Sequence, residues 1–237
     1  MQQSNKKSRS YLQHPERERI DMILTDVPYG MGLDTDYSVM QSDLDFVREK
    51  HTAYGGNKYY QGAVDDFQPR IIENIFNLNV KETFLWGADY YTDHLQNINE
   101  GSWIVWDKRS NEHTDINGSC NADKMFGSCF ELCWSKNKHK REIARIKWAG
   151  IFGTETEFDR KRHHPTQKPI KLSAWFINKY SKEYDVILDL TAGSGSTLLA
   201  SEQTNRKCYA MEIEPVYCQI IINRWENYTG KEAIKVN

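Results

Sequence analysis

No apolar run in the 237-residue sequence approaches the roughly 20 residues that a membrane-spanning helix needs, so no membrane contact is expected. Only 6 prolines and 14 glycines are present and the charged fraction of 27% is ordinary, which argues against a fibrous or disordered chain. The 5 cysteines are odd in number and irregularly spaced, so we expect a reducing compartment and no disulfide framework. The basic first residues also lack the apolar stretch of a secretory signal.

Excess charge of one sign is also missing, since the formal net charge is −2. Taken alone, that value argues against a nucleic-acid partner. Between Lys136 and Lys171, however, 11 basic residues accompany 4 acidic ones, whereas the rest of the chain has 20 basic and 29 acidic residues. Phosphate binding depends on clustered cations, so the whole-chain sum does not exclude DNA. The same stretch also fits an ordinary solvated surface, and charge alone does not decide between these interpretations.

Apolar runs alternate with helical patterns along the chain. Strands are predicted at 20–25, 83–87, 102–107, 130–136, 186–190 and 207–213, and helices at 69–80, 170–182, 197–204 and 214–228, with 88–98 a helix or turn. This alternation predicts an α/β fold with a doubly wound, mostly parallel sheet. We expect a polar N-terminal arm at 1–19 and a single domain at 20–237. Loops inserted at about 30–66 and 107–163 are candidate DNA-contacting regions.

A glycine-containing turn follows the strand predicted at 186–190. Gly193 and Gly195 allow close backbone approach, and the helix behind them offers free N–H groups. Glu212 stands 19 residues beyond Gly193, where an acid can accept hydrogen bonds from ribose hydroxyls. The turn lacks the lysine of a phosphate-binding loop and the third glycine of the dinucleotide fingerprint, so it suits a nucleoside cofactor. The alternative is an ordinary strand–turn–helix corner.

Two further motifs accompany this turn. Asp26-Val27-Pro28-Tyr29-Gly30 follows a predicted buried strand, and the complete HPTQKP motif spans His164 to Pro169. With these motifs in this order, the sequence resembles the β class of S-adenosylmethionine-dependent DNA amino-methyltransferases, and its phage and prophage members in particular. The resemblance covers roughly residues 20–230. It implies a Rossmann-like methyltransferase fold with circularly permuted motif order, and a bacterial or phage-infected cytoplasm as the location.

The resemblance also assigns roles by position. Asp26 and the backbone carbonyl of Val27 accept hydrogen bonds from the amino group of a flipped base, Pro28 shapes the turn, and Tyr29 stacks on the base. S-adenosylmethionine is the implied cofactor, and no metal site is expected. The implied cofactor-binding residues are Thr166, Gln167 and Lys168 at its methionine end, with Asp189, Thr191, Gly193, Ser194, Gly195 and Glu212.

The sequence departs from the family pattern at three places. Val27 stands where the acidic motif usually has its first proline, although a backbone carbonyl can serve there all the same. Leu190 and Thr191 replace a Pro-Phe pair, which removes an aromatic packing surface and predicts weaker cofactor affinity. A Gly-Asp strand that usually precedes the acidic motif is not found in residues 1–19.

The implied reaction is direct transfer of a methyl group to adenine N6 in duplex DNA, by a monomer or a homodimer. Cytosine N4 methylation is the nearest alternative, and the acid at position 26 favours adenine. A non-catalytic nucleic-acid-binding module with the same fold is another alternative, and an RNA substrate is not excluded. No Pro-Cys pair is present, so methylation at cytosine carbon 5 is not expected.

Some residues outside these motifs have competing interpretations. Cys129 and Cys133 fit buried thiols better than zinc ligands, because paired metal-ligand spacing is missing. For Asp107-Lys108-Arg109, at the end of a predicted strand, DNA contact and an ion pair are equally consistent with the sequence. Tryptophans in predicted strands are expected in the core, namely Trp86, Trp103, Trp106 and Trp134.

Overall fold

The computed structural model describes residues 19–30, 66–108, 128–148 and 163–236. Seven strands of these segments form one sheet in the order β5-β3-β4-β2-β1-β6-β7. The strands are β1 (Met22–Thr25), β2 (Glu82–Trp86), β3 (Ser102–Asp107), β4 (Phe130–Ser135), β5 (Glu142–Arg145), β6 (Val186–Asp189) and β7 (Lys207–Ala210). All pairings are parallel except those of β4, which runs antiparallel to both β2 and β3. The α/β class and the mostly parallel sheet are therefore confirmed.

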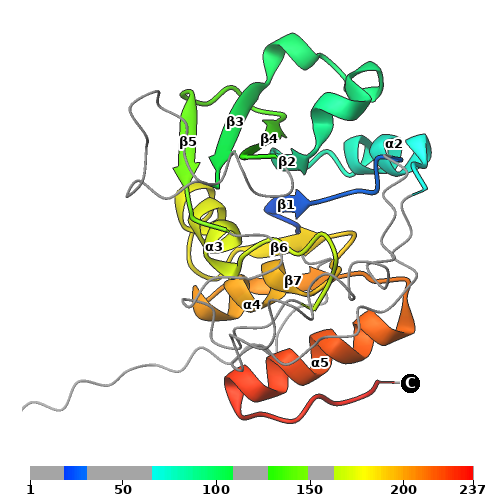
Figure 1. Ribbon diagram of the computed structural model, residues 1–237, viewed down its shortest axis with the longest axis vertical. Helices are drawn as coiled ribbons and strands as arrows, with labels where there is room; N and C mark the ends of the chain where they lie inside the picture. The colour runs from blue at the N-terminus through cyan, green and yellow to red at the C-terminus, as the bar shows by residue number, and fades with distance from the viewer. Residues whose placement is uncertain (1–18, 31–65, 109–127, 149–162, 237) are drawn as a thin grey trace, which may run out of the picture.

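Helices cover both faces of this sheet (Figure 1). One face packs against α2 (Pro69–Asn77) and the short 3₁₀ helices η1 (Ala88–His94) and η2 (Ile98–Glu100). The other face packs against α3 (Ile170–Tyr180) and α4 (Ser196–Gln203), with α5 (Pro215–Thr229) beside α4. The arrangement is doubly wound, as predicted. No helix among the described residues has both the length and the apolar character to cross a membrane.

Two layers of apolar side chains hold the sheet and helices together. Alternate residues of each strand point to opposite faces, so Met22 and Leu24 of β1 join one cluster while Ile23 joins the other. Trp86 and Trp106 are buried in the first cluster and Trp134 in the second, as expected for core residues. Trp103 is only partly buried. The thiol of Cys133 is fully buried between β2 and β3.

Most predicted elements are present with boundaries shifted by a few residues. The segment predicted as a helix or turn forms η1 and η2, and β7 ends at Ala210 where a strand through residue 213 was predicted. β5 was not predicted; it belongs to the sheet although it lies within the range 107–163, where an inserted loop was expected. The N-terminal arm and most of the two predicted loops lie outside the described residues.

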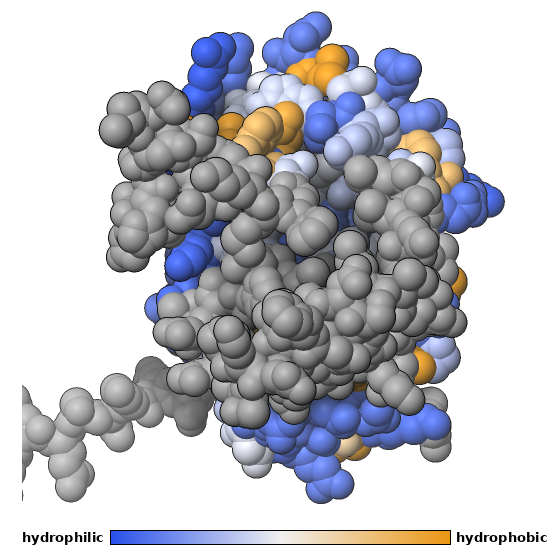
Figure 2. Space-filling model, viewed as in Figure 1, coloured by the Kyte–Doolittle hydropathy of each residue, from blue (hydrophilic) through white to orange (hydrophobic). Residues whose placement is uncertain are grey.

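The topology decides where loops from different strands meet. The carboxyl ends of the six parallel strands lie at one edge of the sheet, and the antiparallel strand β4 brings its amino end, at Phe130, to the same edge. β1 is central, with β2 on one side and β6 on the other. In open α/β sheets, ligands bind in the crevice at the carboxyl ends of the strands, at the position where the strand order reverses. In Figure 2 the coloured surface is mostly hydrophilic, with separate apolar patches.

Candidate active site

A cavity of about 550 Å³ lies at the carboxyl ends of β1 and β6. Of the residues predicted for the site, all but Gly195 line this cavity. The acidic motif, the HPTQKP motif and the glycine turn are therefore brought together, although they are distant in sequence. His164 also lines the cavity. Just after the end of β7, Met211 and Ile213 line it on either side of Glu212.

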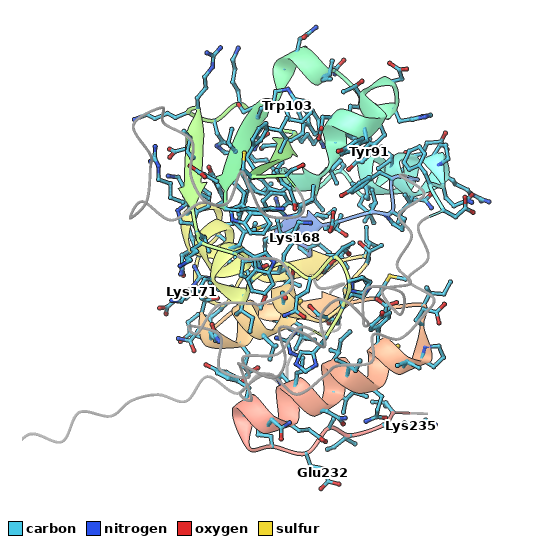
Figure 3. All side chains as sticks on the ribbon, in the orientation of Figure 1. Tyr91, Trp103, Lys168, Lys171, Glu232 and Lys235 are labelled. Carbon is cyan, nitrogen blue, oxygen red and sulfur yellow. The ribbon has the colours of Figure 1, made fainter. Side chains whose placement is uncertain are left out.

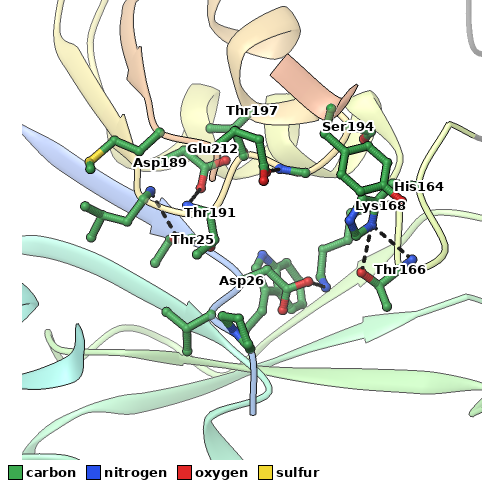
Figure 4. A pocket seen from close by; sticks show the side chains of 18 of the residues that line it. Thr25, Asp26, His164, Thr166, Lys168, Asp189, Thr191, Ser194, Thr197 and Glu212 are labelled. Carbon is green, nitrogen blue, oxygen red and sulfur yellow. Dashed lines mark hydrogen bonds and ion pairs between the residues drawn. The ribbon is translucent and has the colours of Figure 1, made fainter. Parts of the chain in front are cut away.

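The carboxylate of Asp26 has two oxygens in different surroundings. Oδ2 accepts a hydrogen bond from Lys168, which is also an ion pair, and Figure 4 shows the two side chains pointing toward each other. Oδ1 is buried without a hydrogen-bond partner among the described residues. Burial raises the pKa of Asp26, the Lys168 ammonium opposes this, and the nearby Glu131 carboxylate raises it further. One acceptor of Asp26 is thus left for a donor that enters the cavity.

The glycine turn is held against the end of β7 by Glu212. Its Oε2 accepts a hydrogen bond from the backbone N–H of Gly193 at 2.7 Å, and Oε1 accepts from Ile213 and Glu214 at 2.9 and 3.0 Å. An ionised carboxylate has about four acceptor positions. Among the described residues three are used, so one remains on Oε2 for the ribose hydroxyls that Glu212 was expected to bind.

Gly193 and Gly195 both have positive φ, of 52° and 78°, but their surroundings differ. A Cβ on Gly195 would lie 3.0 Å from Ile221 of α5, whereas one on Gly193 would meet the His164 ring at 3.6 Å. Gly195 therefore allows α5 to pack closely against the start of α4, and it does not line the cavity.

The side chain of Asp189, at the end of β6, is buried. Burial raises its pKa to about 6, against the opposing effect of hydrogen bonds from Thr197, Thr191 and Thr25. The Thr191 hydroxyl lies 2.8 Å from that of Thr25, and the Thr25 hydroxyl also accepts from the Leu190 N–H at 3.2 Å. The threonine that replaces the family's aromatic residue thus links the glycine turn to β1.

The three residues expected at the methionine end of the cofactor differ in how their polar atoms are used. Gln167 is buried, and its side-chain oxygen accepts from the backbone of His163 at 2.6 Å, which closes the HPTQKP turn. Lys168 lies near the centre of the molecule, whereas Glu232 and Lys235 lie at its outside (Figure 3). Thr166 is exposed and hydrogen-bonded to His164.

Tyr29 also has a partner within the protein, because its ring stacks on Tyr90 with centroids 4.8 Å apart. The ring still lines the cavity, while Tyr90 does not. Val27 is buried, and Pro28 lies between it and Tyr29 at the cavity wall. Burial, with the nearby Asp26 carboxylate, raises the pKa of the Tyr29 hydroxyl, so it stays protonated near neutral pH.

Sequence reasoning missed three residues that support this arrangement: Thr25, Glu131 and Arg224. Arg224 is buried on α5 and donates to the backbone carbonyl of Ser194, which fixes the glycine turn. Glu131 forms ion pairs with Lys108 and Lys168. For Lys108, of the two interpretations left open, the ion pair is observed. For Glu131 the signal was a charged residue between apolar neighbours, Phe130 and Leu132, whereas Thr25 and Arg224 each have a polar neighbour and carry no such signal.

The chain matches a known protein family. The N6/N4 methyltransferase family, described as DNA methylase, matches residues 105–223. The Type II methyltransferase M.HpaI of Haemophilus parainfluenzae is 24% identical over 94% of the chain and 74% of that protein. M.HindIII of Haemophilus influenzae is 39% identical over a shorter region, 33% of the chain and 26% of that protein.

The fold has a counterpart among solved structures. A complex of M1.HpyAVI with S-adenosylmethionine superposes with a TM-score of 0.51 at 20% identity, over 88% of this chain and 89% of that one. This likeness supports the fold assignment independently of the sequence motifs.

Proposed function

Because the chain belongs to the N6/N4 DNA methylase family and is an S-adenosylmethionine-dependent DNA methyltransferase, we propose that its target is the N6 amino group of adenine. The observation that carries this proposal is Oδ1 of Asp26, which lies buried beside the cavity without a partner in the described residues. An exocyclic amino group is a donor that matches it. The acid at position 26 is the feature that favours adenine over cytosine.

The chemistry requires an acceptor at that place. The lone pair of an aromatic amine is delocalised into the ring, which makes the nitrogen a weak nucleophile. Acceptors at Asp26 Oδ1 and the Val27 carbonyl would favour the pyramidal nitrogen of the transition state, and their fixed orientation is a form of electrostatic preorganisation. Holding donor and acceptor in line contributes further, up to about 7–11 kcal/mol in favourable systems.

The cavity fits S-adenosylmethionine by the chemistry of its lining. The remaining acceptor position of Glu212 suits a ribose hydroxyl, and Met211, Ile213 and Leu190 offer apolar surface to an adenine ring. When bound, the cofactor supplies a methyl group activated by a sulfonium. Thr166 and Asp189 are proposed to hold it together with the glycine turn. Gln167 and Lys168 are proposed to act mainly by shaping the wall, because their polar atoms are engaged within the protein.

The target base must leave the duplex to reach Asp26, at a cost of a few kcal/mol. The Tyr29 ring would stack on the flipped base, and base–aromatic stacking returns about 1–3 kcal/mol. Since Tyr90 occupies one face of Tyr29, the base would use the face toward the cavity.

Backbone phosphates need cations near the same edge of the sheet. Arg145 and Lys147 are exposed and have no ion-pair partner among the described residues. Arg145 ends β5 opposite Asp107, one residue from Lys108. We propose that this basic row, defined as Arg145 and Lys147, contacts DNA phosphates.

The test is methyl transfer from labelled S-adenosylmethionine to duplex DNA, followed by mass analysis of the hydrolysed bases. We expect N6-methyladenine from the wild type and none from Asp26→Ala. Glu183→Ala is a matched control, because Glu183 is an exposed acid before β6, at the opposite edge of the sheet.

Each other outcome has a defined meaning. N4-methylcytosine as the product would overturn the adenine assignment while leaving the site intact. Unlabelled DNA combined with measurable cofactor binding would point to another nucleic-acid substrate, to be tested with RNA. Absence of both cofactor binding and transfer would favour the non-catalytic module.

A further inference from the structure

Four charged side chains of alternating sign lead from the surface of the sheet to the cavity. Lys108 follows β3, Glu131 lies at the start of β4, and Lys168 belongs to the HPTQKP motif. Glu131 contacts Lys108 through Oε1 and Lys168 through Oε2, the latter at 3.2 Å. Lys168 in turn contacts Oδ2 of Asp26. The row joins residues of four separate segments, and Asp26 is its only member that takes part in the proposed chemistry directly.

The ammonium groups of Lys108 and Lys168 each lie over the ring of a tryptophan side chain. The ammonium of Lys168 lies 5.2 Å from the centroid of Trp86, and that of Lys108 lies 4.9 Å from the centroid of Trp106. The two indoles pack edge to face with centroids 6.0 Å apart. Only 11% and 16% of the two lysine side chains is exposed, which makes the cation–π attraction stronger than at an open surface. Both cations are thus held in place and are little available to solvent.

Glu131 does not line the cavity, so it has no place in binding the cofactor or the base. Its effect must pass through Lys168. An ammonium has three donors, of which one goes to Asp26 Oδ2 and one to Glu131 Oε2. Without the Glu131 contact, the same ammonium is free to bridge both oxygens of Asp26, which would occupy the acceptor meant for the substrate.

We propose that Glu131 is a positioning residue, which holds the Lys168 ammonium on Oδ2 of Asp26 and so keeps Oδ1 available to the target amino group. This inference rests on the proposed function for the identity of that amino group. The row Lys108–Glu131–Lys168–Asp26 carries no net charge when all four groups are ionised. Lys108 completes it by neutralising the charge that Glu131 would otherwise leave in a partly desolvated place.

The proton balance of the reaction gives Glu131 a second effect. As the bond between the methyl carbon and nitrogen forms, the carbon–sulfur bond breaks and the cofactor leaves as a neutral thioether. The nitrogen then carries one proton too many, and Asp26 Oδ1 is placed to take it. Asp26 must therefore be ionised at the start, and its basicity depends on the charges around it.

The neighbours of Asp26 predict the direction of that dependence. Burial raises its pKa, Lys168 lowers it and Glu131 raises it, with Lys108 as a further cation. Among the described residues, the other titratable groups that interact electrostatically with Asp26 are Tyr29, Tyr91, Cys133 and Asp189. Removing the Glu131 charge while keeping its shape should lower the pKa of Asp26. The acid limb of the pH–rate profile should then move to lower pH, and the rate on the plateau should fall because Asp26 is a weaker acceptor.

The experiment compares Glu131→Gln with Glu142→Gln in the full chain. Glu142 is a close match, since it lies on the neighbouring part of the sheet, pairs with Lys179 at 3.0 Å and is 26% exposed, against 29% for Glu131. For Glu131→Gln we expect an at least tenfold lower single-turnover rate of methylation, an acid limb at lower pH and cofactor affinity within twofold of the wild type. Glu131→Asp, which keeps the charge, should restore the position of the acid limb. Glu142→Gln should change none of these.

A second measurement does not depend on activity. Carbon-13 NMR titration of the Asp26 carboxyl, assigned with Asp26→Asn, should show its pKa lowered in Glu131→Gln and unchanged in Glu142→Gln. An unchanged Asp26 titration in Glu131→Gln would overturn the inference whether or not the wild type methylates DNA. Equal loss of rate in the two glutamine variants, with the acid limb unmoved, would assign Glu131 a structural role only. If the wild type does not methylate DNA, the proposed function fails, while the NMR titration still decides the role of Glu131.

Discussion

The rings of Tyr29 and Tyr90 stack with their planes 2° from parallel and their centroids 4.8 Å apart. Tyr29 belongs to the acidic motif after β1, whereas Tyr90 lies in η1 after β2, so the stack joins that motif to η1 at the carboxyl edge of the sheet. Gly87, between β2 and η1, lies against the same ring: a Cβ there would be 2.4 Å from Cε1 of Tyr29. The orientation of Tyr29 therefore depends on a position outside its own motif.

Gly87→Ala should impair use of the target base. Its φ of 63° strains an alanine, at a cost of about 1 kcal/mol, and the new methyl group would displace the Tyr29 ring. We expect a loss of methylation rate of tenfold or more, with cofactor affinity little changed because Gly87 does not line the cavity. Single-turnover methylation and cofactor titration measure the two effects separately.

Gly230→Ala separates backbone strain from the clash. Gly230 ends α5 with a φ of 68°, and nothing lies within 4 Å of a Cβ at that position. The Gly230→Ala variant should lose about as much stability as Gly87→Ala does from backbone strain, but it should keep the wild-type methylation rate. A similar rate loss in both variants would show that Tyr29 is not the cause.

Central strands could be predicted from the sequence, whereas the edge strand β5 could not. β1 and β6 are short apolar runs, MILT and VILD, because both faces of a central strand are covered by helices. β5 reads EIAR, and only Ala144 is buried, since β5 forms the edge of the sheet. Its two apolar residues, Ile143 and Ala144, stand between charged residues and are too short an apolar signal for this strand to be recognised from its own sequence.

In the candidate site, the position of a motif next to its own strand could be predicted, but its contacts with the other motifs could not. The acidic motif and the glycine turn each follow a predicted strand, so their place at the carboxyl edge could be expected in advance, whereas the HPTQKP motif precedes a predicted helix and its place could not. Contacts between motifs are a different matter: Thr25 and Thr191 are 166 positions apart, and Lys168 and Asp26 are 142 apart. Such pairs depend on strand order, and no spacing in the sequence encodes the neighbours that each side chain will meet.

The Thr25–Thr191 hydrogen bond should appear as a coupling in stability. We expect Thr191→Val to cost about 1 kcal/mol and Thr25→Val about 1–3 kcal/mol, because Thr25 also accepts from the Leu190 N–H. In a double-mutant cycle measured by urea unfolding, the two changes should couple by about 1 kcal/mol.

Thr83 provides the control for this cycle. It is as buried as Thr25, but its hydroxyl donates to the carbonyl of Val80. Thr83→Val combined with Thr191→Val should therefore be additive. Additivity in the Thr25 and Thr191 pair as well would show that their hydrogen bond contributes nothing measurable.

Asp189 should make stability depend on pH. Its pKa in the folded state is about 6, above the ordinary value of 3.8, so the folded chain binds this proton more readily than the unfolded chain. The resulting stabilisation is present below about pH 4 and is lost as the pH rises through about 6. Relative to the wild type, Asp189→Asn should thus gain up to about 3 kcal/mol between pH 4 and pH 7, before any constant loss from weaker hydrogen bonds. Urea unfolding across this range measures the change, and a pH-independent difference would contradict it.

The basic row should be visible in the salt dependence of DNA binding. Each phosphate contact contributes about 0.9 to the slope of log affinity against log salt concentration. If Arg145 and Lys147 each contact one phosphate, the variant with both replaced by alanine should bind DNA more weakly, and the magnitude of its slope should fall by about 1.8. Lys182→Ala is the control, because Lys182 is exposed but precedes β6 at the opposite edge of the sheet. Fluorescence anisotropy with a labelled duplex at several salt concentrations provides the slopes. Equal slopes in the wild type and the double variant would remove the basic row from the DNA interface, whatever happens to affinity at one salt concentration.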